Sequence, residues 1–372
     1  MLLAFYFLLL VFFTFGPDLW IWHHFTEDSN LLIASVWFLP SLIIIASWFA
    51  VRKGFHHVAA VRLIFGGMLC FTFPKIAFIL TYWFLGTQIA FYLALGIVAC
   101  VLYGLIWGWR RVVVKNITIY SPDLPASFDG YRILQLSDFH VGTYPANTHF
   151  VGKVVDICNS LYCDLGVFTG DLVNNSPAEV NPYITDLKRL QCKDGFYSIW
   201  GNHDYCLTGN DRSEKNILAH QKELYRIESQ LGWHQLMNEH VTLEKGGEHI
   251  QLIGVENAGA APFPNKCNLQ DAMGDIPLSD YKILLSHDPH HWRKEALQND
   301  IQLMLAGHTH AGQLKIGKFT FARFAFKEWG GLYHHGHQHL YVSYGIGGSF
   351  PFRLGAWPEI TVLTLKRKPS SR

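Results

Sequence analysis

The amino-terminal part of the chain carries very little charge, and this constrains its fold more than any other feature. Residues 1–109 contain only seven charged side chains, although the whole sequence holds 30 Lys+Arg and 29 Asp+Glu. The apolar stretches of this part are approximately residues 2–15, 31–51, 63–85 and 88–109. Three of them reach the ~20 residues that a helix needs to cross a bilayer, and the first does so if it continues through Trp20. We therefore predict about four transmembrane helices within residues 1–111, followed by a soluble domain over residues 112–372.

The competing interpretation of residues 1–15 is a cleaved signal peptide. Such a peptide begins with a basic segment, whereas this chain begins Met-Leu-Leu-Ala. We therefore expect a retained helix at the amino terminus.

Basic residues near the ends of membrane spans stay on the cytoplasmic side. Here they lie between the second and third stretches (Arg52, Lys53 and Arg62) and after the fourth (Arg110, Arg111 and Lys115). With four spans, both basic segments fall on the same side of the membrane. We predict a multi-pass protein of the cell (inner) membrane whose soluble domain lies in the cytoplasm.

Lys75 follows Pro74 inside the third apolar stretch. An ionisable residue at membrane depth is a candidate functional residue, whereas the alternative is a lysine that reaches the interface or faces the bundle interior. Because the predicted spans contain no second charged residue to pair with Lys75, we expect the structural role.

Charge and cysteine content exclude some classes of function. The net charge is +1 and no basic run of the kind that binds phosphate backbones is present, so we expect no nucleic-acid partner. The seven cysteines form no CxxC pair, which argues against a zinc knuckle or a disulfide framework.

Short apolar runs closed by polar residues replace the long stretches after residue 112. The clearest are residues 132–136, 165–168, 196–200, 250–255, 282–285, 302–305, 340–344 and 360–365. Runs of this length with two apolar faces are typical of strands in a sheet that is covered on both sides. Residues 147–161 and 182–190 have the apolar spacing of helices. We expect an α/β sandwich of two sheets with outer helices.

Five of these runs end in side chains that bind transition metals. They are Asp138 and His140 in "LQLSDFHVG", Asp171 in "VFTGDLVNN", Asn202 and His203 in "SIWGNHDY", His287 in "LLSHDPHH", and His308 and His310 in "LMLAGHTHAGQ". Ligands of open α/β sheets gather beyond the carboxyl ends of the strands, and a two-residue spacing at a strand end projects both side chains to one side. Imidazole, carboxylate and amide groups together suit two Mn, Fe or Zn ions better than Ca or Mg.

The combination of D-x-H, G-D, G-N-H-D, a later H and G-H-x-H resembles the calcineurin-like metallophosphoesterase superfamily over roughly residues 118–366. "SDFH", "SHDP", "GHTHAGQ" and "FPFRLGAWPEI" are similar to its bacterial branch with amino-terminal transmembrane helices. The resemblance implies a four-layer α/β/β/α fold. Phe139 and Ala311 depart from residues frequent in the family, but neither departure removes a ligand.

The resemblance also implies a role for each residue of the motifs. Asp138, His140 and His310 would hold one metal ion, Asn202, His287 and His308 a second, and Asp171 would bridge them. His203 would protonate the leaving oxygen, with Asp204 as the residue that orients it. Arg353 in "PFRLG" is our candidate phosphate clamp, and a surface arginine at a strand entry is the alternative.

These features together predict a membrane-anchored hydrolase of phosphomono-/diester or pyrophosphate bonds. Two metal ions ~3.5–4 Å apart would activate a bridging hydroxide that attacks phosphorus. The anchor favours a lipid-linked substrate, because tethering raises the effective concentration at the bilayer. A soluble (cyclic) nucleotide is the alternative within the same chemistry. A non-catalytic membrane sensor with a metal-binding domain is the alternative from another class.

Overall fold

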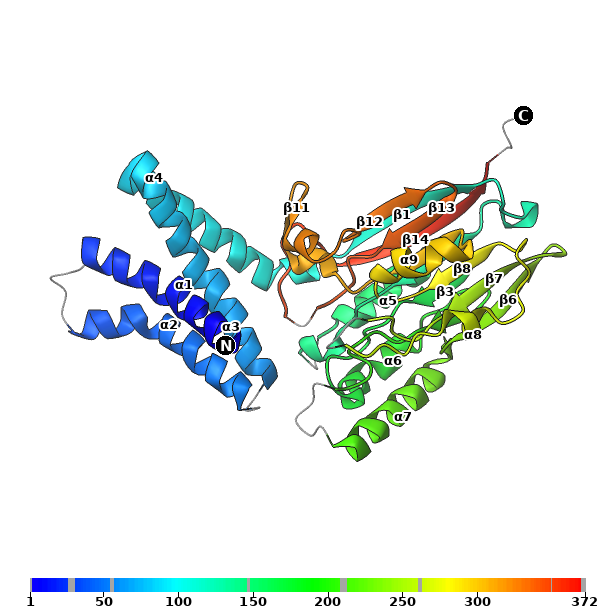
Figure 1. Ribbon diagram of the computed structural model, residues 1–372, viewed down its shortest axis with the longest axis horizontal. Helices are drawn as coiled ribbons and strands as arrows, with labels where there is room; N and C mark the ends of the chain where they lie inside the picture. Colours follow the sequence, from blue (N-terminus) through cyan, green and yellow to red (C-terminus); the bar gives the residue numbers. More distant parts are fainter. Residues whose placement is uncertain are drawn as a thin grey trace. The chain divides into compact units, whose positions relative to one another are not determined.

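The computed structural model describes residues 2–25, 31–53, 57–145, 148–207, 213–259, 263–348 and 350–368. The chain divides into two compact units, Met1–Ile106 and Trp107–Arg372 (Figure 1). We describe each unit by itself.

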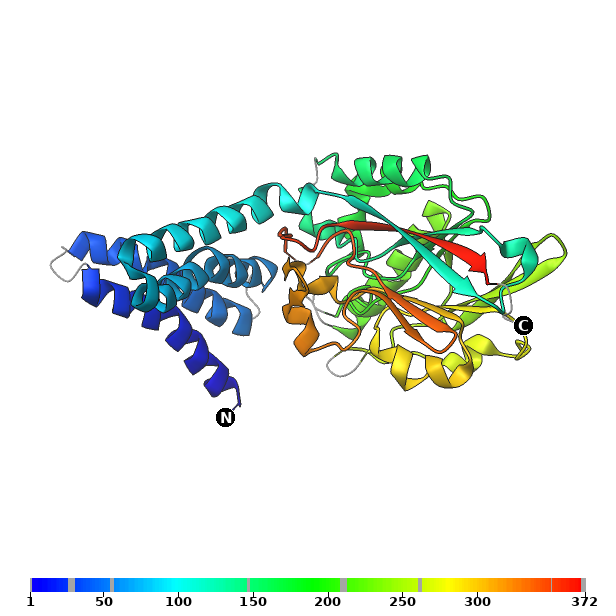
Figure 2. The ribbon, with the colours of Figure 1, turned by 90° about the horizontal axis from the view of Figure 1, so that it is seen from above.

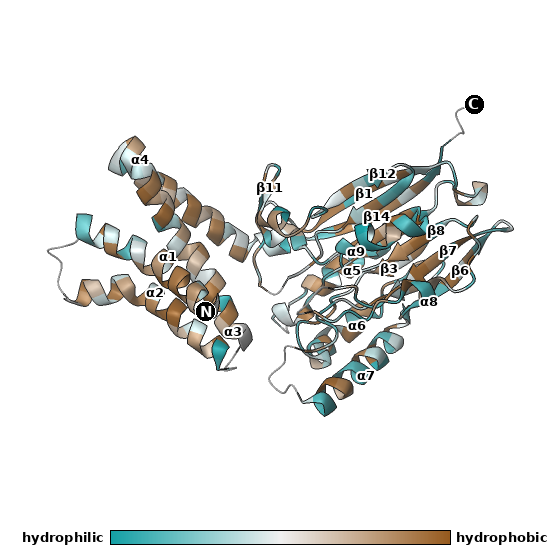
Figure 3. Ribbon diagram, viewed as in Figure 1, coloured by the Kyte–Doolittle hydropathy of each residue, from teal (hydrophilic) through white to brown (hydrophobic). Residues whose placement is uncertain are grey.

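The first unit is helical. Its elements are α1 (Leu2–Phe25), α2 (Leu31–Arg52), α3 (His57–Gly67), the π-helix η1 (Met68–Thr72) and α4 (Phe73–Ile106). Within the residues that the structure describes, three helical stretches are long and apolar enough to cross a membrane: Ala4–Phe25, Leu32–Arg52 and Ala59–Arg110. In Figure 3 the ribbons of these helices are coloured predominantly as hydrophobic residues.

The third and fourth predicted spans form one helical stretch of 52 residues. A straight helix of this length would extend ~78 Å, more than twice the thickness of the hydrocarbon core. The stretch is broken at Gly86, where φ is 77° and ψ is 169°. The break lies at the turn predicted between the two spans, and it divides the stretch into two parts that are each long enough to cross.

A buried ion pair lies inside the first unit. Helix α1 continues beyond the predicted end of the first span and includes Asp18, which is fully buried. The Oδ1 atom of Asp18 accepts a hydrogen bond from Lys75 Nζ at 2.5 Å, and Oδ2 accepts one from Ser41 Oγ at 2.6 Å. The expectation that Lys75 has no charged partner is therefore wrong, because the first helix is longer than predicted.

The second unit contains two six-stranded mixed sheets. The first has the order β1 (Val113–Ser121), β14 (Glu359–Arg367), β2 (Arg132–Leu136), β3 (Leu165–Phe168), β4 (Phe196–Ser198) and β5 (His234–Gln235). The second has the order β12 (Gly331–His335), β13 (Gln338–Val342), β9 (Leu303–Ala306), β8 (Lys282–Leu285), β7 (Glu248–Gly254) and β6 (Glu239–Lys245). Strands β2 to β5 run parallel, as do β7, β8, β9 and β13.

The two sheets pack face to face, with helices on their outer faces (Figure 2). A central core joins residues of both sheets, such as Ile133 and Val167 of the first and Leu252 and Leu285 of the second. Helices α5 (Phe150–Ser160), α6 (Ile184–Leu187) and α7 (Glu214–Leu231) contribute to the core of the first sheet's outer face. Helices α8 (Leu269–Met273) and α9 (His290–Lys294) do so for the second sheet. The predicted α/β/β/α sandwich is confirmed.

Short 3-10 helices connect these elements. They are η2 (Gly108–Arg110), η3 (Ala126–Phe128), η4 (Val141–Thr143), η5 (Pro177–Tyr183), η6 (Ala296–Asn299), η7 (His310–Gln313) and η8 (Phe321–Phe324).

Trp109 belongs to the core of the second unit, although the sequence placed it at the end of the fourth span. Its indole is 6% exposed, stacks on Tyr144 with ring centroids 5.5 Å apart, and meets the edge of Phe150 at 5.4 Å. Helix α4 ends before it, at Ile106. The chain thus enters the soluble core within a few residues of the last helical turn.

Candidate metal centre

The predicted ligands lie in loops at the carboxyl ends of five strands. Asp138 and His140 follow β2, Asp171 follows β3, Asn202 and His203 follow β4, His287 follows β8, and His308 and His310 follow β9. Five of them have positive φ angles: Asp138, His140, Asp171, His308 and His310. Non-glycine residues seldom adopt this conformation, and such strain concentrates at functional sites. The ligands are therefore positioned by left-handed turns, and not by the extended spacing that we expected.

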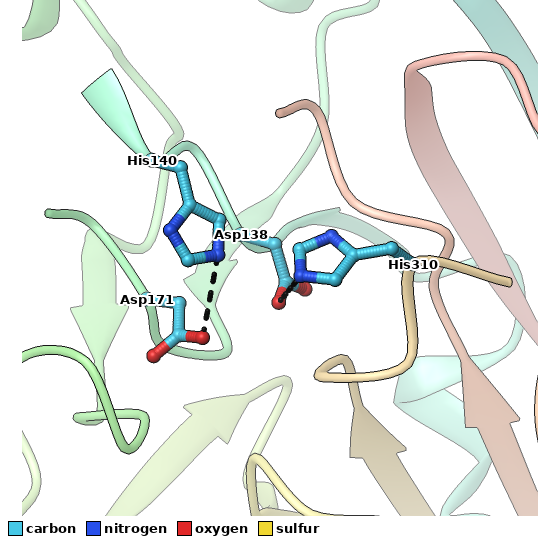
Figure 4. Close-up of side chains that lie close together, drawn as sticks. All are labelled: Asp138, His140, Asp171 and His310. Carbon is cyan, nitrogen blue, oxygen red and sulfur yellow. Dashed lines mark ion pairs between the residues drawn. The ribbon is translucent and has the colours of Figure 1, made fainter. Parts of the chain in front are cut away.

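One group of ligands contains Asp138, His140, Asp171 and His310 (Figure 4). Their ligand atoms all lie within 4.8 Å of one another. His140 Nε2 is 3.4 Å from Asp171 Oδ2, and His310 Nε2 is 3.6 Å from Asp138 Oδ1. Four side chains from three strands thus converge on a volume that one cation would fill.

A second group contains Asp171, His287 and His308. His287 Nε2 is 3.2 Å from Asp171 Oδ2 and 3.1 Å from His308 Nδ1. Asp171 is common to both groups. The four histidines of the two groups thus fall two to a group, with the Asp171 carboxylate common to both.

Asn202 supplies an unusual acceptor. Its side chain is 6% exposed, and within the described residues its Oδ1 atom has no hydrogen-bond partner. A buried carbonyl oxygen without a partner costs about 1–3 kcal/mol. A divalent cation would satisfy it, and a neutral amide adds no negative charge beside an anionic substrate. The donor set therefore fits two transition-metal ions.

Backbone and amide oxygens fix the histidine rings. His287 Nδ1 donates to Thr169 O at 2.7 Å, and His203 Nδ1 donates to Asn174 O at 2.8 Å, since a carbonyl oxygen only accepts. His140 Nδ1 lies 2.8 Å from Asn174 Oδ1. These contacts leave Nε2 of His140 and His287 for the metal centre, the usual arrangement around metal sites, and Nε2 of His203 for another role.

Asn174 thus holds two of the site's rings, and we did not single it out from the sequence. Its side chain also donates to Thr143 Oγ1 at 3.0 Å. The only signal in the sequence was its place three residues after Asp171 in "GDLVNN".

Among the described residues, no hydrogen bond joins Asp204 to the ring of His203, which is the bond that the predicted orienting role requires. The Asp204 carboxylate accepts hydrogen bonds from the backbone N–H groups of Asp171 (2.7 Å), Leu172 (2.8 Å), Val173 (3.3 Å) and Gly201 (2.9 Å). The carboxylate therefore holds the turn that carries Asp171 against the Asn202 loop. Burial and the charge of Asp171 raise the pKa of Asp204 to about 7.

Arg353 is also placed differently from its prediction. The side chain is 1% exposed, and its guanidinium donates to the backbone carbonyls of His310, Tyr344, Gly345, Gly347 and Ala356. Both Nη atoms are committed to these carbonyls and brace the loop of His310, whereas the buried Nε atom has no hydrogen-bond partner among the described residues. Burial lowers its pKa to about 10.

The ionisation of the carboxylates in the site favours the binding of cations. Burial raises the pKa of Asp171, but the charges of His287 and His203 and a hydrogen bond from His140 outweigh burial and hold the pKa well below its ordinary value. Burial lowers the pKa of His287, whereas Asp171 and Asp138 raise it to about 10. The carboxylates thus attract positive charge, and bound metal ions would displace the proton of His287.

Close side-chain contacts and a positive φ angle require two glycines of the motifs. A Cβ atom at Gly307 would overlap Ser137 Oγ and Asp138 Oδ2, and Gly170 has φ of 93°. A side chain at either position would separate the loops that carry the ligands.

Comparison with known proteins agrees with this geometry. Residues 131–312 match the family model described as calcineurin-like phosphoesterase. The metallophosphoesterase YkuE of Bacillus subtilis is 31% identical over 259 residues, which cover 67% of this chain and 84% of that protein. The chain belongs to the calcineurin-like metallophosphoesterase family. A transmembrane protein with metallophosphoesterase domain from Danio rerio is 30% identical over 278 residues, or 71% of this metallophosphoesterase, which spans only 60% of that relative.

A solved structure, the phosphopantetheinyl hydrolase of Mycobacterium tuberculosis, aligns with a TM-score of 0.38 and 11% identity. The alignment covers 60% of this chain and 91% of the other.

Proposed function

We propose that this metallophosphoesterase is a membrane-anchored dimetal enzyme that hydrolyses phosphomono-/diester or pyrophosphate bonds. The observation that carries the proposal is the position of Asp171, whose Oδ2 atom lies 3.4 Å from His140 Nε2 and 3.2 Å from His287 Nε2. One carboxylate shared by two ligand groups is what a pair of adjacent ions needs.

Two divalent ions, for which Mn, Fe and Zn are the candidates, would neutralise the phosphate oxygens and activate a water molecule as the nucleophile. The first group with Asp138, His140 and His310 would hold one ion. Asn202, His287 and His308 would hold the other, and Asp171 would bridge.

His203 is the proposed proton donor to the leaving oxygen. Its Nδ1 proton is fixed on Asn174 O, so only Nε2 is left to exchange a proton. Burial lowers the pKa of His203, which keeps the resting ring neutral. A phosphate anion next to the ring would raise this pKa, so that the ring takes up a proton with the substrate and gives it to the leaving oxygen.

The test uses the full chain in detergent, loaded with Mn and assayed on p-nitrophenyl phosphate and bis(p-nitrophenyl) phosphate. We expect hydrolysis of at least one ester, lost on Asp171→Asn and retained by Asp275→Asn, whose side chain is exposed. Activity that is unchanged in Asp171→Asn would refute the shared-carboxylate mechanism. Wild-type protein that binds metal without turnover would favour the sensor alternative.

We place the catalytic unit in the cytoplasm, on the basis of the basic residues Arg52, Lys53 and Arg62 after the second span and Arg110 and Arg111 after the last. A reporter fused after residue 372 should be active in its cytoplasmic form. Activity only in a form that works outside the cytoplasm would reverse the orientation.

A further inference from the structure

The segment that follows the metal-binding loop exposes a cluster of apolar side chains. Residues 315–327, here called the aromatic hairpin, read KIGKFTFARFAFK. They form β10 (Lys315–Ile316), β11 (Phe319–Thr320) and η8. The exposed apolar residues are Ile316 (67%), Phe319 (40%), Phe321 (54%) and Phe324 (76%).

These side chains form one patch. The ring of Phe319 lies 5.4 Å from that of Phe321 and 6.2 Å from that of Phe324, measured between centroids. Contiguous exposed apolar patches are uncommon on soluble proteins and indicate an interaction surface.

The charge of the aromatic hairpin identifies the partner. It carries Lys315, Lys318, Arg323 and Lys327 and no acidic residue. Basic residues interleaved with aromatic ones are typical of segments that lie in the membrane interface, where rings enter the acyl boundary and cations meet anionic headgroups.

The aromatic hairpin is fastened to the metal-binding loop. Thr320 is fully buried, and its hydroxyl donates to Ala311 O at 2.5 Å, one residue after the ligand His310. Beyond η8, the ring of Phe326 lies 5.3 Å from the ring of the ligand His308. The exposed rings therefore have a fixed position relative to the metal centre.

Within the second unit, the aromatic hairpin also lies near the point at which the chain leaves its last membrane span. That span candidate ends at Arg110. Gly108 packs against the backbone of Arg353, since a Cβ atom there would overlap Arg353 O. The next residue, Leu354, accepts a hydrogen bond from Lys315 N at 2.8 Å. The residue at which the chain leaves the span and the base of the aromatic hairpin thus contact two adjacent residues, Arg353 and Leu354.

We infer that the aromatic hairpin lies in the interface of an anionic lipid bilayer and presents the His308–His310 edge of the metal centre to phosphoesters carried by membrane lipids. The membrane contact stands on the exposed rings, the basic residues and the span exit. The choice of substrate rests in addition on the proposed function.

The membrane contact is tested by photo-cross-linking of the full chain in lipid nanodiscs that contain phosphatidylglycerol. Phe324→p-benzoylphenylalanine should form a lipid adduct, whereas Leu278→p-benzoylphenylalanine, at a site that is 80% exposed, should not. Absence of an adduct at position 324, or equal adducts at both positions, would overturn the inference.

The substrate is tested with two diesters that share one leaving group: methyl p-nitrophenyl phosphate in solution and hexadecyl p-nitrophenyl phosphate in the disc. The double variant Phe321→Ser, Phe324→Ser and the variant Lys318→Glu should lose about tenfold on the lipid ester and little on the methyl ester. Equal loss on both esters, or no loss on either, would overturn the lipid-substrate part.

Different results would contradict the hydrolase activity and the membrane contact of the aromatic hairpin. Wild-type protein inactive on every ester contradicts the proposed function, yet the cross-linking result still decides whether the aromatic hairpin enters the interface. Hydrolysis of both esters without a lipid adduct at position 324 leaves the enzyme standing and removes the membrane contact.

Discussion

At the scale of single residues, the geometry of the site depends on Asp204 and Asn174, which hold other residues of the site in position. The Asp204 carboxylate accepts hydrogen bonds from four backbone N–H groups. Asn174 holds the rings of His140 and His203 through its side-chain and backbone oxygens. The candidate ligands could be selected from the sequence because each follows an apolar run. The contacts of Asp204 and Asn174 could not be selected in this way, because backbone carbonyl and N–H partners leave no pattern in the order of side chains.

The role of His203 predicts a dependence on the leaving group. His203→Gln should lower turnover ~10²–10⁴-fold for phenyl phosphate, whose leaving oxygen needs a proton, and much less for p-nitrophenyl phosphate. Steady-state kinetics of the full chain on both esters measure the difference. His234→Gln, at an exposed position on β5, is the control. An equal loss on both esters would show that His203 is not the proton donor.

The buried carboxyl group of Glu228 leads us to expect that the stability of the second unit depends on pH. Glu228 is fully buried on α7, accepts hydrogen bonds from Ser198 Oγ at 2.6 Å and Trp200 Nε1 at 2.9 Å, and burial raises its pKa from 4.5 to about 8. Between these values the folded protein keeps a proton that the unfolded chain releases. The free energy of unfolding therefore falls as the pH rises, by up to ~1.4 kcal/mol per unit.

Glu228→Gln should remove this part of the slope, because the amide does not titrate. Melting temperatures of the second unit between pH 5 and pH 8 test it, with the exposed Glu223→Gln on the same helix as the control. Parallel pH profiles for wild type and Glu228→Gln would contradict the assignment.

At the scale of elements, a strand could be predicted from the sequence where its buried residues form a continuous apolar run. Strands β2, β3 and β8 begin and end at the predicted residues, because both of their faces are buried and the run is continuous. Strand β1 was not predicted, since exposed residues such as Lys115 and Asn116 interrupt its apolar ones. Helix α7 was not predicted either, because few apolar residues form its buried face.

The packing of Trp109 predicts that the second unit begins before residue 112. Trp109→Ala would leave a cavity beside Tyr144 and Phe150 and should lower the stability of the second unit by ~3–5 kcal/mol. Trp107→Ala, at a side chain that is 56% exposed, should change it by less than ~0.5 kcal/mol. Denaturant unfolding followed by hydrogen exchange in α5 measures both. Similar effects of the two substitutions would place Trp109 outside the core.

A soluble fragment designed at the predicted boundary, residue 112, lacks Trp109 and should be unstable for the same reason. A fragment that begins at residue 107 retains it.

At the scale of the whole molecule, the chain contains a helical unit with an Asp18–Lys75 pair and an α/β sandwich with a basic aromatic surface. An ion pair among helices that are apolar enough to cross a membrane costs free energy, and Ser41 Oγ donates a further hydrogen bond to Asp18. The composition separated the two units readily. It did not reveal the pair, because Asp18 and Lys75 are 57 residues apart in the chain.

The central claim is that Asp171 is shared by two metal ions. Metal analysis of the full chain, purified after loading with Mn, tests it most directly. We predict two ions per wild-type chain, a loss of at least one in Asp171→Asn, and two in the exposed control Asp275→Asn. One ion per wild-type chain, or two ions retained in Asp171→Asn, would contradict the dimetal centre.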